Sequence, residues 1–551
     1  MPYFNTKSPL FLVPLNDNVK EEKKLEAFMN LLSRSGIENF LATSDLNHDQ
    51  GRPSQLTDSL FAVILYAFSE CDGSLRNIEK QCLYDVRYIH LSSQQKFRKS
   101  TIANFINDVI VPNMDAIFAA VTREIAKEMN IDPLSEIFID GTKIEANANK
   151  YRFQWKSDNK MEKLIGQVSV FMKDNDIPFS ENPSKPYSFE IGTALKYLDE
   201  LLQSKGIDSS KIVTGKGKRI SREERLYLQV KKYFSRMLEY EEINKICGPS
   251  RKSFYKTDKD ATAMCLKDDY YAGLGSSMHA AYNVQIAVNK GIIVGFYVSQ
   301  DRADSRTLPS FVAKMKEQWG CFPGLICADA GYGSLANYRF IHDNSIGNYI
   351  KYPSWEGEMS GTRPALYGFD DKENLVCLGG KELVEVALSR HPSHSDSRFY
   401  EVKRCYGCPY KKYCKKQLKK KTGSRIFEVS KDWLRYKKEA EKNLLSSKGI
   451  ELRVNRSIQA EGTFGIIKQD IGYDRFRRRG IEKVSAELML VCLGANIRKY
   501  LRFIETGVLP KFWVAPDNLQ PEVLRKISYV VRKGGKKKQK KQPNEIAKKR
   551  R

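Results

Sequence analysis

Three acidic residues occupy positions from which a folded chain can bring them together. Asp140 follows the apolar run 137–139, and Asp329 follows a second apolar run at 325–328. Each precedes a glycine-containing turn, whereas Glu461 lies in a segment of helical pattern. The ends of adjacent buried strands, with a helix across the sheet, gather such side chains into one site. Three carboxylates suit two Mg²⁺ (or Mn²⁺) ions about 3.5–4 Å apart, which activate a nucleophile and stabilise the leaving oxygen of a phosphodiester.

Each carboxylate also has an ordinary structural explanation. An aspartate after a strand is most often a turn former or a helix cap. The chain combines a strand with an aspartate, a hairpin, a helix, a second strand with an aspartate and a helix with a glutamate, in that order. This order restricts the possible functions much more than any single carboxylate does. Four further carboxylates lie in this part of the chain, Asp258, Asp260, Asp301 and Asp304. For Asp301 and Asp304, a structural role in a turn or as a helix cap is the safer assignment.

Basic side chains flank Glu461 in the sequence. Lys468 is seven residues further on, two helical turns away and on the same face, where it could contact a DNA phosphate. A solvated surface charge is the alternative. Arginine forks bind phosphates bidentately, which favours a DNA role for the neighbouring arginines. These are Arg453, Arg456, Arg475, Arg477, Arg478 and Arg479.

Four of the eleven cysteines fall in one short region, Cys377, Cys405, Cys408 and Cys414. The Cys-x₂-Cys step matches structural zinc spacing, so the set could bind one Zn²⁺ as Cys₄, with His391 and His394 as alternative ligands. The segment lacks apolar residues to fold on its own, which favours zinc. Four reduced thiols in an irregular, lysine-rich loop are the alternative.

The charge balance favours a polyanionic partner. Lys and Arg total 92 against 66 for Asp and Glu, a net charge of +26. The last twenty residues carry eleven basic residues and one acid, or +10, so +16 remains on the body of the chain. Such a field attracts nucleic acid through counterion release. The alternative explanation of the charge is a basic tail of the kind that also occurs on proteins that never bind nucleic acid.

The elements that must position these residues follow from periodicity. Apolar alternation predicts a hairpin at 282–298 with the turn Asn289-Lys290-Gly291. Helices are predicted at about 305–319, 335–343, 452–469 and 481–504, and strands at 137–140, 325–328 and 349–352. Short helices at 56–68, 75–83 and from 102, with Arg87, Lys96, Arg98 and Lys99 between them, suit either a helix-turn-helix unit or a plain helical bundle.

These elements predict an α/β protein of several domains. Residues 1–130 form a helical, DNA-binding domain, and 131–352 form the first part of a catalytic domain with a charged helical insertion at about 151–250. An inserted Cys/Lys-rich module follows at 353–440. Residues 441–505 complete the catalytic domain, and 506–551 form a C-terminal segment with a basic tail too polar to fold alone.

The carboxylate pattern resembles that of the DDE transposases of bacterial insertion sequences, over roughly residues 30–505. The resemblance is carried by Ile139-Asp140-Gly141-Thr142, by Ala328-Asp329-Ala330-Gly331-Tyr332 and by Glu461 followed by Lys468. More narrowly, the chain resembles the insertion-sequence group eleven-eighty-two. Three segments carry this resemblance: Asp140-Gly-Thr-Lys-Ile-Glu-Ala-Asn-Ala-Asn, Thr257-Asp-Lys-Asp-Ala and Tyr282-Asn-Val-Gln.

This resemblance implies a ribonuclease H-like catalytic core in which Asp140, Asp329 and Glu461 form the catalytic triad. It implies double-stranded DNA as the partner, both transposon ends and target, with a homodimer bridging two ends. One departure stands out. Related transposases carry Tyr-x₂-Arg-x₃-Glu-x₆-Lys, whereas Val454 and Ser457 occupy the expected Tyr and Arg positions here. Arg453 and Arg456 are close enough to substitute for that arginine.

Two other functions remain open: a nuclease of the same fold that hydrolyses without joining, and an inactive relative that only binds DNA. No uninterrupted apolar stretch approaches the roughly 20 residues that cross a bilayer, and the N-terminus lacks a secretory pattern. We therefore expect a cytoplasmic, nucleoid-associated bacterial protein without a membrane partner.

Overall fold

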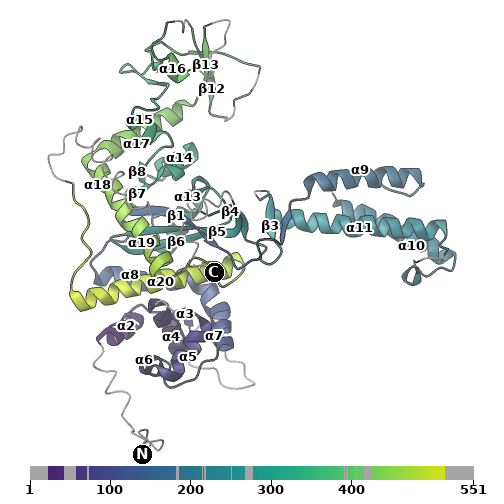
Figure 1. Ribbon diagram of the computed structural model, residues 1–551, viewed down its shortest axis with the longest axis horizontal. Coiled ribbons are helices and arrows are strands. Elements are labelled where there is room, and N and C mark those ends of the chain that lie inside the picture. The colour runs from purple at the N-terminus through teal and green to yellow at the C-terminus, as the bar shows by residue number, and fades with distance from the viewer. Residues whose placement is uncertain are drawn as a thin grey trace, which may run out of the picture. The chain divides into compact units, whose positions relative to one another are not determined.

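The computed structural model divides the chain into two compact units. Unit 1 comprises Met1–Ile144 and Asn283–Arg551, and unit 2 comprises Glu145–Tyr282 (Figure 1). The structure describes residues 23–41, 57–70, 73–180, 185–213, 215, 219–249, 251–266, 277–389, 391–392, 395–403, 405, 407–414 and 423–515. The predicted basic tail lies outside the described residues from 516 onward.

A mixed β-sheet forms the centre of unit 1, as expected for an α/β protein. Its strands follow the order β6-β5-β1-β7-β8, in which β1, β7 and β8 are parallel and β5–β6 is an antiparallel hairpin. Lys290 and Gly291 both have positive φ, 44° and 84°, as a two-residue hairpin turn of this hand requires. The predicted hairpin is therefore confirmed. The strands are β1 (Ile137–Glu145), β5 (Met278–Asn289), β6 (Ile292–Ser299), β7 (Leu325–Ala328) and β8 (Gly347–Ile350).

Helices cover this sheet, and the longest of unit 1 is almost wholly buried along its middle. Helix α20 (Ile481–Thr506) packs against β6, α4 and α8. The Asn496 side chain accepts from the Ile293 amide and donates to the Ile293 carbonyl, both at 2.8 Å. The Lys499 amine donates to the Gly291 carbonyl, and its burial lowers its pKa to about 8. Side chains of α20 thus hold the hairpin turn in place. Helices α13 (Leu308–Trp319) and α14 (Leu335–Asp343) lie where they are predicted.

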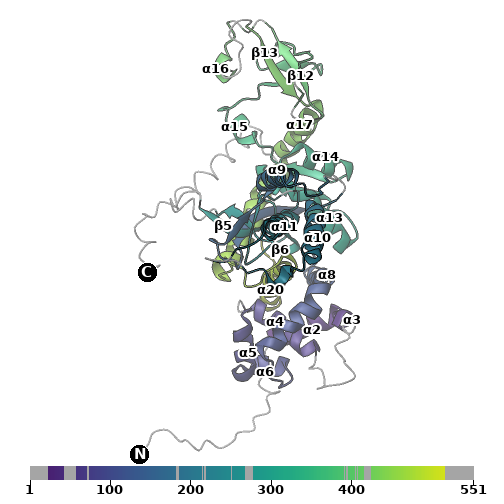
Figure 2. The ribbon, with the colours of Figure 1, turned by 90° about the vertical axis from the view of Figure 1, so that its right-hand side faces the viewer.

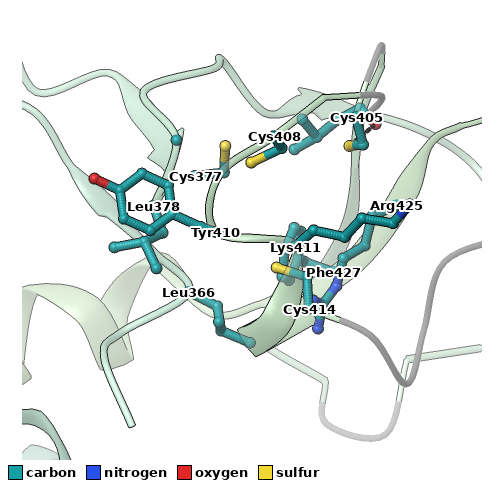
Figure 3. A pocket seen from close by; sticks show the side chains of 12 residues that line it. Leu366, Cys377, Leu378, Cys405, Cys408, Tyr410, Lys411, Cys414, Arg425 and Phe427 are labelled. Atoms are coloured by element: carbon teal, nitrogen blue, oxygen red, sulfur yellow. Dashed lines mark hydrogen bonds between the residues drawn. The ribbon is translucent and has the colours of Figure 1, made fainter. Parts of the chain in front are cut away.

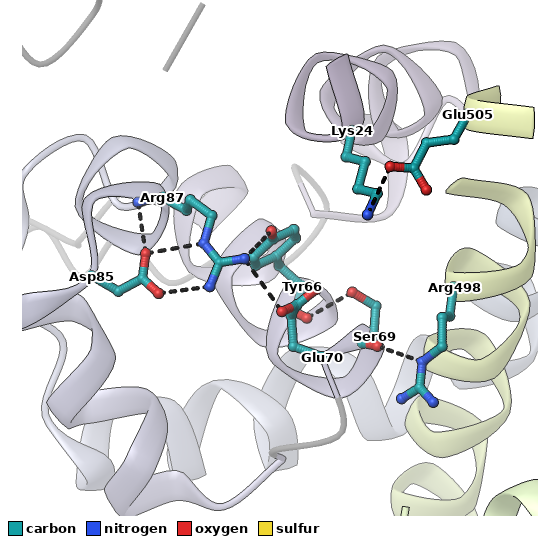
Figure 4. Close-up of polar contacts among 8 residues, drawn as sticks. All are labelled: Lys24, Tyr66, Ser69, Glu70, Asp85, Arg87, Arg498 and Glu505. Atoms are coloured by element: carbon teal, nitrogen blue, oxygen red, sulfur yellow. Dashed lines mark hydrogen bonds and ion pairs between the residues drawn. The ribbon is translucent and has the colours of Figure 1, made fainter. Parts of the chain in front are cut away.

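The N-terminal helices of unit 1 pack against α20 (Figures 1 and 2). Lys24 pairs with Glu505 at 2.8 Å, and the Arg498 Nε donates to the Ser69 carbonyl at 3.0 Å (Figure 4). A Cβ at position 494 would lie 2.4 Å from the Phe68 carbonyl oxygen, so α20 needs glycine where α4 crosses it. The helices are α2 (Lys23–Arg34), α3 (Glu38–Leu41), α4 (Thr57–Ser69), α5 (Leu75–Tyr84), α6 (Val86–Leu91), α7 (Lys99–Phe105) and α8 (Val111–Glu128).

Arg87, one of the basic residues grouped with a helix-turn-helix unit, is committed to contacts within the chain. Its guanidinium pairs with Asp85 at 2.8 Å and Glu70 at 3.3 Å, and donates to the Tyr66 hydroxyl at 3.2 Å (Figure 4). The hydrogen bond to Asp85 raises the pKa of Arg87. This arginine therefore connects α4 to α6, and the assignment of these helices to a helix-turn-helix unit stays a prediction.

One helical stretch, Lys99–Glu128, is long and apolar enough by length and composition to cross a membrane. It comprises α7, the π-helical segment Ile106–Ile110 and α8. Half of its most apolar window is buried inside the structure, and Ile117, Phe118 and Val121 are fully enclosed. These side chains pack within unit 1 as those of a core helix do.

The inserted module has its own hydrophobic core, contrary to the expectation that it lacks the apolar residues to fold. Small antiparallel sheets β9–β10 and β11–β12–β13 enclose it. The buried residues are Leu375, Leu383, Tyr400, Val402, Phe427, Val429 and Leu434. The module contains α15 (Trp355–Met359), β9 (Tyr367–Phe369), β10 (Leu375–Cys377), β11 (Val384–Glu385), β12 (Arg398–Val402), α16 (Lys411–Cys414), β13 (Arg425–Val429) and α17 (Lys431–Leu445).

Unit 2 is built on three helices with a shared apolar core. Leu164 of α9, Leu198 of α10 and Val230 of α11 are buried in one cluster. Helix α11 begins with a capping box in which Ser221 and Glu224 bond each other's backbone amides, which stabilises its N-terminus. The helical content predicted for 151–250 is present. The elements are β2 (Phe153–Trp155), α9 (Asp158–Asp174), α10 (Tyr187–Ser204), α11 (Arg222–Cys247), β3 (Ser253–Tyr255) and β4 (Thr262–Cys265), which pairs with the start of β5.

Candidate active site

The register of two parallel strands places Asp140 beside Asp329. Ile137 pairs with Ile326 and Phe138 with Cys327, and the same offset of positions aligns 140 with 329. Adjacent strands lie roughly 4.8 Å apart, and aligned residues of parallel strands face the same side of the sheet. Two carboxylates that are remote in sequence thus become neighbours. Strand β1 continues to Glu145, so the expectation that Asp140 ends its strand is wrong: it lies within the strand.

Asp329 also serves as a cap, as the structural alternative predicts. Its Oδ1 accepts from the Gly331 amide at 2.8 Å, at the start of the 3₁₀ turn Ala330–Tyr332. A Cβ at Gly331 would lie 2.9 Å from that oxygen, so glycine leaves room for the carboxylate to turn back. The cap orients the Asp329 side chain through one oxygen and leaves Oδ2 available for a ligand.

Glu461 lies in a helix whose pitch is locally altered. The predicted helix runs from α18 (Ser447–Arg456) through a π-helical segment, Ser457–Glu461, and α19 (Gly462–Gly465) to a second π-helical segment, Ile466–Asp470. In π-helix, residues five apart align, whereas in α-helix residues four apart do. Arg456 stands five residues before Glu461, and its Nη2 lies 2.7 Å from the Glu461 Oε1. The π-helical segment therefore brings Arg456 to the place that an arginine at position 457 would occupy in a regular helix.

Arg456 also reaches Asp140. Its Nη1 lies 3.7 Å from the Asp140 Oδ1, and the two side chains are 11% and 15% exposed. Burial acts to lower the pKa of Arg456, but Asp140 and the other carboxylates outweigh it, and the net shift is upward. The guanidinium thus joins the strand carboxylate to the helix carboxylate. A positive charge already lies between Asp140 and Glu461.

Asp304 is a fourth carboxylate of this site, which the sequence analysis assigned to a turn. Its Oδ1 accepts hydrogen bonds from the side-chain amides of Asn283, at 2.8 Å, and Gln285, at 3.0 Å. A Cβ at Gly141 would lie 2.9 Å from Asp304 Oδ1, and one at Gly331 would lie 3.6 Å from Asp304 Oδ2. Asp304 therefore lies between the residues that follow Asp140 and Asp329.

The polar residues Asn283 and Gln285 of the hairpin point to Asp304 only once their burial is known. Asn283 and Gln285 alternate with apolar residues along β5, yet both are buried, at 1% and 0% exposure. Buried amides need partners, and theirs is Asp304. The buried Tyr332 donates its hydroxyl to Gln285 Oε1. Burial raises the pKa of Tyr332 well above its ordinary value, and Asp304, Asp140 and Asp329 raise it further, as expected for three nearby carboxylates.

The donor set fits a hard divalent cation in its chemistry. Asp140, Asp329 and Glu461 offer the carboxylate oxygens that Mg²⁺ and Mn²⁺ prefer. Among the described residues, no three His, Cys, Asp or Glu side chains are grouped closely enough to hold a metal ion. In this arrangement the Arg456 guanidinium supplies the compensating charge. The Glu461 side chain is 55% exposed and has room to rotate toward the strands.

Residues 376–501 match a family model described as a transposase DDE domain. This match supports a DDE transposase. It covers less than half of the chain, including Glu461, Lys468 and the four clustered cysteines, while Asp140 and Asp329 lie outside it. Transposases of this class use divalent metal ions and act on DNA. No curated protein and no solved structure matches the chain.

The residues predicted to bind DNA take different positions around the site. The Lys468 amine donates to the Lys143 carbonyl of β1 at 3.3 Å, so this lysine reaches the strand that carries Asp140. Arg453 instead donates to the Gly449 carbonyl and stacks over the Trp355 ring at 5.5 Å. Burial lowers the pKa of Arg453. Arg456, and not Arg453, is therefore the arginine of the carboxylate site.

The arginine cluster after the Glu461 helix divides in two. Arg475, Arg477 and Arg479 are exposed. Arg478 is partly buried, and its Nη1 donates to Asn107 Oδ1 at 2.9 Å. Burial lowers the pKa of Arg478. The exposed members remain candidates for phosphate contacts, whereas Arg478 connects this loop to the N-terminal helices.

The four clustered cysteines line one small cavity of about 30 Å³ in the inserted module (Figure 3). A Cβ at Gly379 would lie 3.3 Å from the Cys408 sulfur and 3.7 Å from the Cys377 sulfur. Burial raises the pKa of the Cys405 thiol, Lys381 opposes the rise, and the other three thiols add to it. His391 is exposed and does not line the cavity, and His394 lies outside the described residues, as do Lys415 to Lys421.

Proposed function

We propose that this chain is the DNA transposase of an insertion sequence. It binds terminal inverted repeats and catalyses metal-dependent strand cleavage and strand transfer. The observation that carries the proposal is the alignment of Asp140 with Asp329 on β1 and β7, together with the Arg456 guanidinium that connects Asp140 to Glu461. The match of residues 376–501 to a transposase DDE domain supports it independently.

The chemistry assigns a part to each residue of the site. Asp140, Asp329 and Glu461 would hold the divalent cations, which would activate the attacking oxygen and stabilise the leaving one. Asp304 lies between Gly141 and Gly331, the glycines that follow the two strand aspartates, and Asn283 and Gln285 hold its carboxylate there. Water attacks the phosphodiester at the element end, and the freed 3′-hydroxyl then attacks target DNA. Lys468 and the exposed Arg475 and Arg477 contact phosphates on either side.

The architecture around the site fits a ribonuclease H-like catalytic domain of the insertion-sequence group eleven-eighty-two. A hairpin joined to parallel strands, with helices on the sheet, supports this assignment. The helices α2 to α8 serve as the DNA-binding domain, and a homodimer bridges two element ends. The net charge of +26 supports DNA as the partner, because such a field attracts phosphates.

The test uses the purified chain, Mg²⁺ and labelled DNA ends taken from the flanks of its gene. Cleavage at the ends followed by joining to a second DNA supports the proposal. Cleavage without joining identifies a nuclease. Binding without cleavage identifies a DNA-binding relative, and either of these results overturns the proposed strand transfer.

Asp304→Asn is expected to slow cleavage by roughly 10- to 100-fold and to raise the Mg²⁺ concentration needed for half-maximal rate, as for other residues that orient metal ligands. The amide retains the shape of the side chain but loses the negative charge beside Gly141 and Gly331. The measurement is the cleavage rate across a Mg²⁺ titration. Asp301→Asn is the matched control, because Asp301 lies on the same loop and its carboxylate is 3.9 Å from Arg306. Equal rates for both variants and the wild type would contradict the assignment.

We also propose that the inserted module binds one structural Zn²⁺ through Cys377, Cys405, Cys408 and Cys414. Thiolates are the preferred zinc ligands, and these four line a single cavity. Because no three of the described ligands are grouped closely enough for a metal, the thiols must reorient on binding. The module's own apolar core can hold the fold in either state.

The zinc proposal predicts about one equivalent of zinc in the purified chain, falling to near zero in Cys405→Ser and Cys408→Ser. Cys321→Ser, which removes an exposed thiol outside the module, should retain the metal. Metal analysis by mass spectrometry measures the content, and thiol titration with and without a chelator gives a second reading. A wild-type chain that contains no zinc and gains none on titration excludes the site.

A further inference from the structure

Strand β2 of unit 2 and the turn before it, which contains Tyr151, present aromatic side chains to solvent. Tyr151, Phe153 and Trp155 are 80%, 44% and 57% exposed. Rings of this size are ordinarily buried on one side, and a contiguous exposed apolar patch usually marks an interaction site. These three residues, termed the aromatic strand, occupy alternate positions within five residues of chain. Neither the carboxylate site nor the cysteine cluster includes them.

The strand holds its rings in a fixed arrangement. Side chains two residues apart share one face of a strand, and the ring centroids of Phe153 and Trp155 lie 5.5 Å apart, edge to face. Phe153 pairs with the buried Tyr255 of β3, and their centroids are 6.4 Å apart. Backbone hydrogen bonds on both sides, Lys256 N to Arg152 O and Lys156 N to Lys252 O, secure the ribbon at 2.8 Å. The β2–β3 ribbon therefore supports the rings on one side, and their other side is exposed to solvent.

Positive charges surround the rings in the sequence, with Gln154 as the one uncharged residue between them. Lys150, Arg152 and Lys156 occupy the positions before, between and after them, and the Lys150 amine lies 5.3 Å from the centre of the Tyr151 ring. On β3, the exposed Lys252 and Lys256 flank the paired residues. Lys156 pairs with Asp158 at 3.3 Å. The ribbon thus combines five cations with three exposed rings, a surface complementary to an anionic chain that carries planar groups.

We propose that the aromatic strand stacks on unpaired bases of DNA while the neighbouring cations contact the flanking phosphates. An aromatic face accepts any base, and interleaved cations follow the backbone, which is how sequence-independent single-strand binding is built. A paired duplex hides the faces of its bases, so the ligand is a strand whose bases are unpaired or extruded. The inference rests on the proposed function in that DNA is the substrate, and it adds a base-stacking site outside the carboxylate centre.

Binding is measured on the full chain without Mg²⁺, so that cleavage plays no part. The ligands are an oligonucleotide duplex with an unpaired segment that contains 2-aminopurine, and the same duplex fully paired. Trp155→Ala is expected to weaken binding to the unpaired segment by roughly 5- to 150-fold, the range found for loss of one stacking ring, and to restore the fluorescence of 2-aminopurine. Trp155→Phe should retain most of both effects, and binding to the paired duplex should change little.

Phe189→Ala is the matched control. Phe189 of α10 lies in the same unit, is 53% exposed and has the Lys185 amine 4.3 Å from its ring centre, but it lies on a helix and not on a strand. It should bind like the wild type, because Tyr187 packs against the core and leaves Phe189 as a single exposed ring. Wild-type binding by both Trp155→Ala and Phe153→Ala would overturn the proposal. So would a DNA-free dimer that dissociates when all three rings are replaced by alanine, since a second copy would then cover the strand.

The two proposals fail separately. If the wild type stacks on unpaired bases but never cleaves element ends, the transposase proposal falls and the base-stacking site stands. If it cleaves and joins while the ring variants bind unpaired DNA normally, only the base-stacking site is lost.

Discussion

Asp140→Asn, Asp329→Asn and Glu461→Gln are each expected to reduce DNA cleavage by at least about a thousandfold, or roughly 4 kcal/mol of transition-state stabilisation. Each change keeps the size of the side chain and removes one anionic oxygen ligand. The two strand aspartates are aligned neighbours, and Glu461 reaches them from the helix through Arg456. Loss of any one member should therefore disable the shared site. The measurement is the rate of cleavage and joining of labelled element ends in Mg²⁺.

DNA binding provides the control for this prediction. The basic residues that attract phosphates are untouched, so all three variants should bind the ends at least as tightly as the wild type. Asp343→Asn, at the exposed end of α14, should cleave normally. Variants that cut as fast as the wild type would show that the catalytic carboxylates lie elsewhere in the chain.

Arg456→Met is expected to lower the free energy of unfolding by about 2 kcal/mol in chelator, and Mg²⁺ should recover more stability in this variant than in the wild type. The guanidinium is largely buried and lies 2.7 Å from Glu461 and 3.7 Å from Asp140. Without it the carboxylates repel each other, although the partly exposed Glu461 can turn toward water. A divalent cation then binds without displacing a competing charge. Denaturant unfolding with and without Mg²⁺ measures both effects.

Arg453→Met separates this effect from simple loss of packing. Arg453 lies on the same helix, where it contacts the Trp355 ring and the Gly449 carbonyl. Its replacement should cost stability that Mg²⁺ does not restore. If Mg²⁺ stabilises the two variants equally, Arg456 does not act as the counter-charge of the metal site.

Local sequence patterns predicted many of the elements. Alternation along 282–298, with a glycine-containing turn, specified the hairpin because strand period and turn residues act within a few residues. The boundaries of β7 and α14 follow from a short apolar run and from an apolar helical face in the same way. The carboxylates next to these elements identified Asp140, Asp329 and Glu461 as candidate metal ligands.

Other features depended on contacts that no local pattern reports. The register of β1 on β7 joins segments almost two hundred residues apart, and it decides that Asp140 faces Asp329 from within a strand. Asp304 belongs to the site because two buried amides of β5 need its carboxylate. Arg87 looked like a surface cation, yet three groups of neighbouring helices engage it.

The sequence by itself determined which residues were available for metal and phosphate chemistry, together with the strands and helices that carry them, because residue type and short-range periodicity are local properties. The tertiary structure alone decided which cation lies between the carboxylates. Ser457 occupies the expected arginine position, but a π-helical segment shifts the alignment by one residue and brings Arg456 to Glu461. The sequence left Arg453 and Arg456 as candidates for that arginine, and only the folded chain places Arg456 at Glu461 and Arg453 over the Trp355 ring.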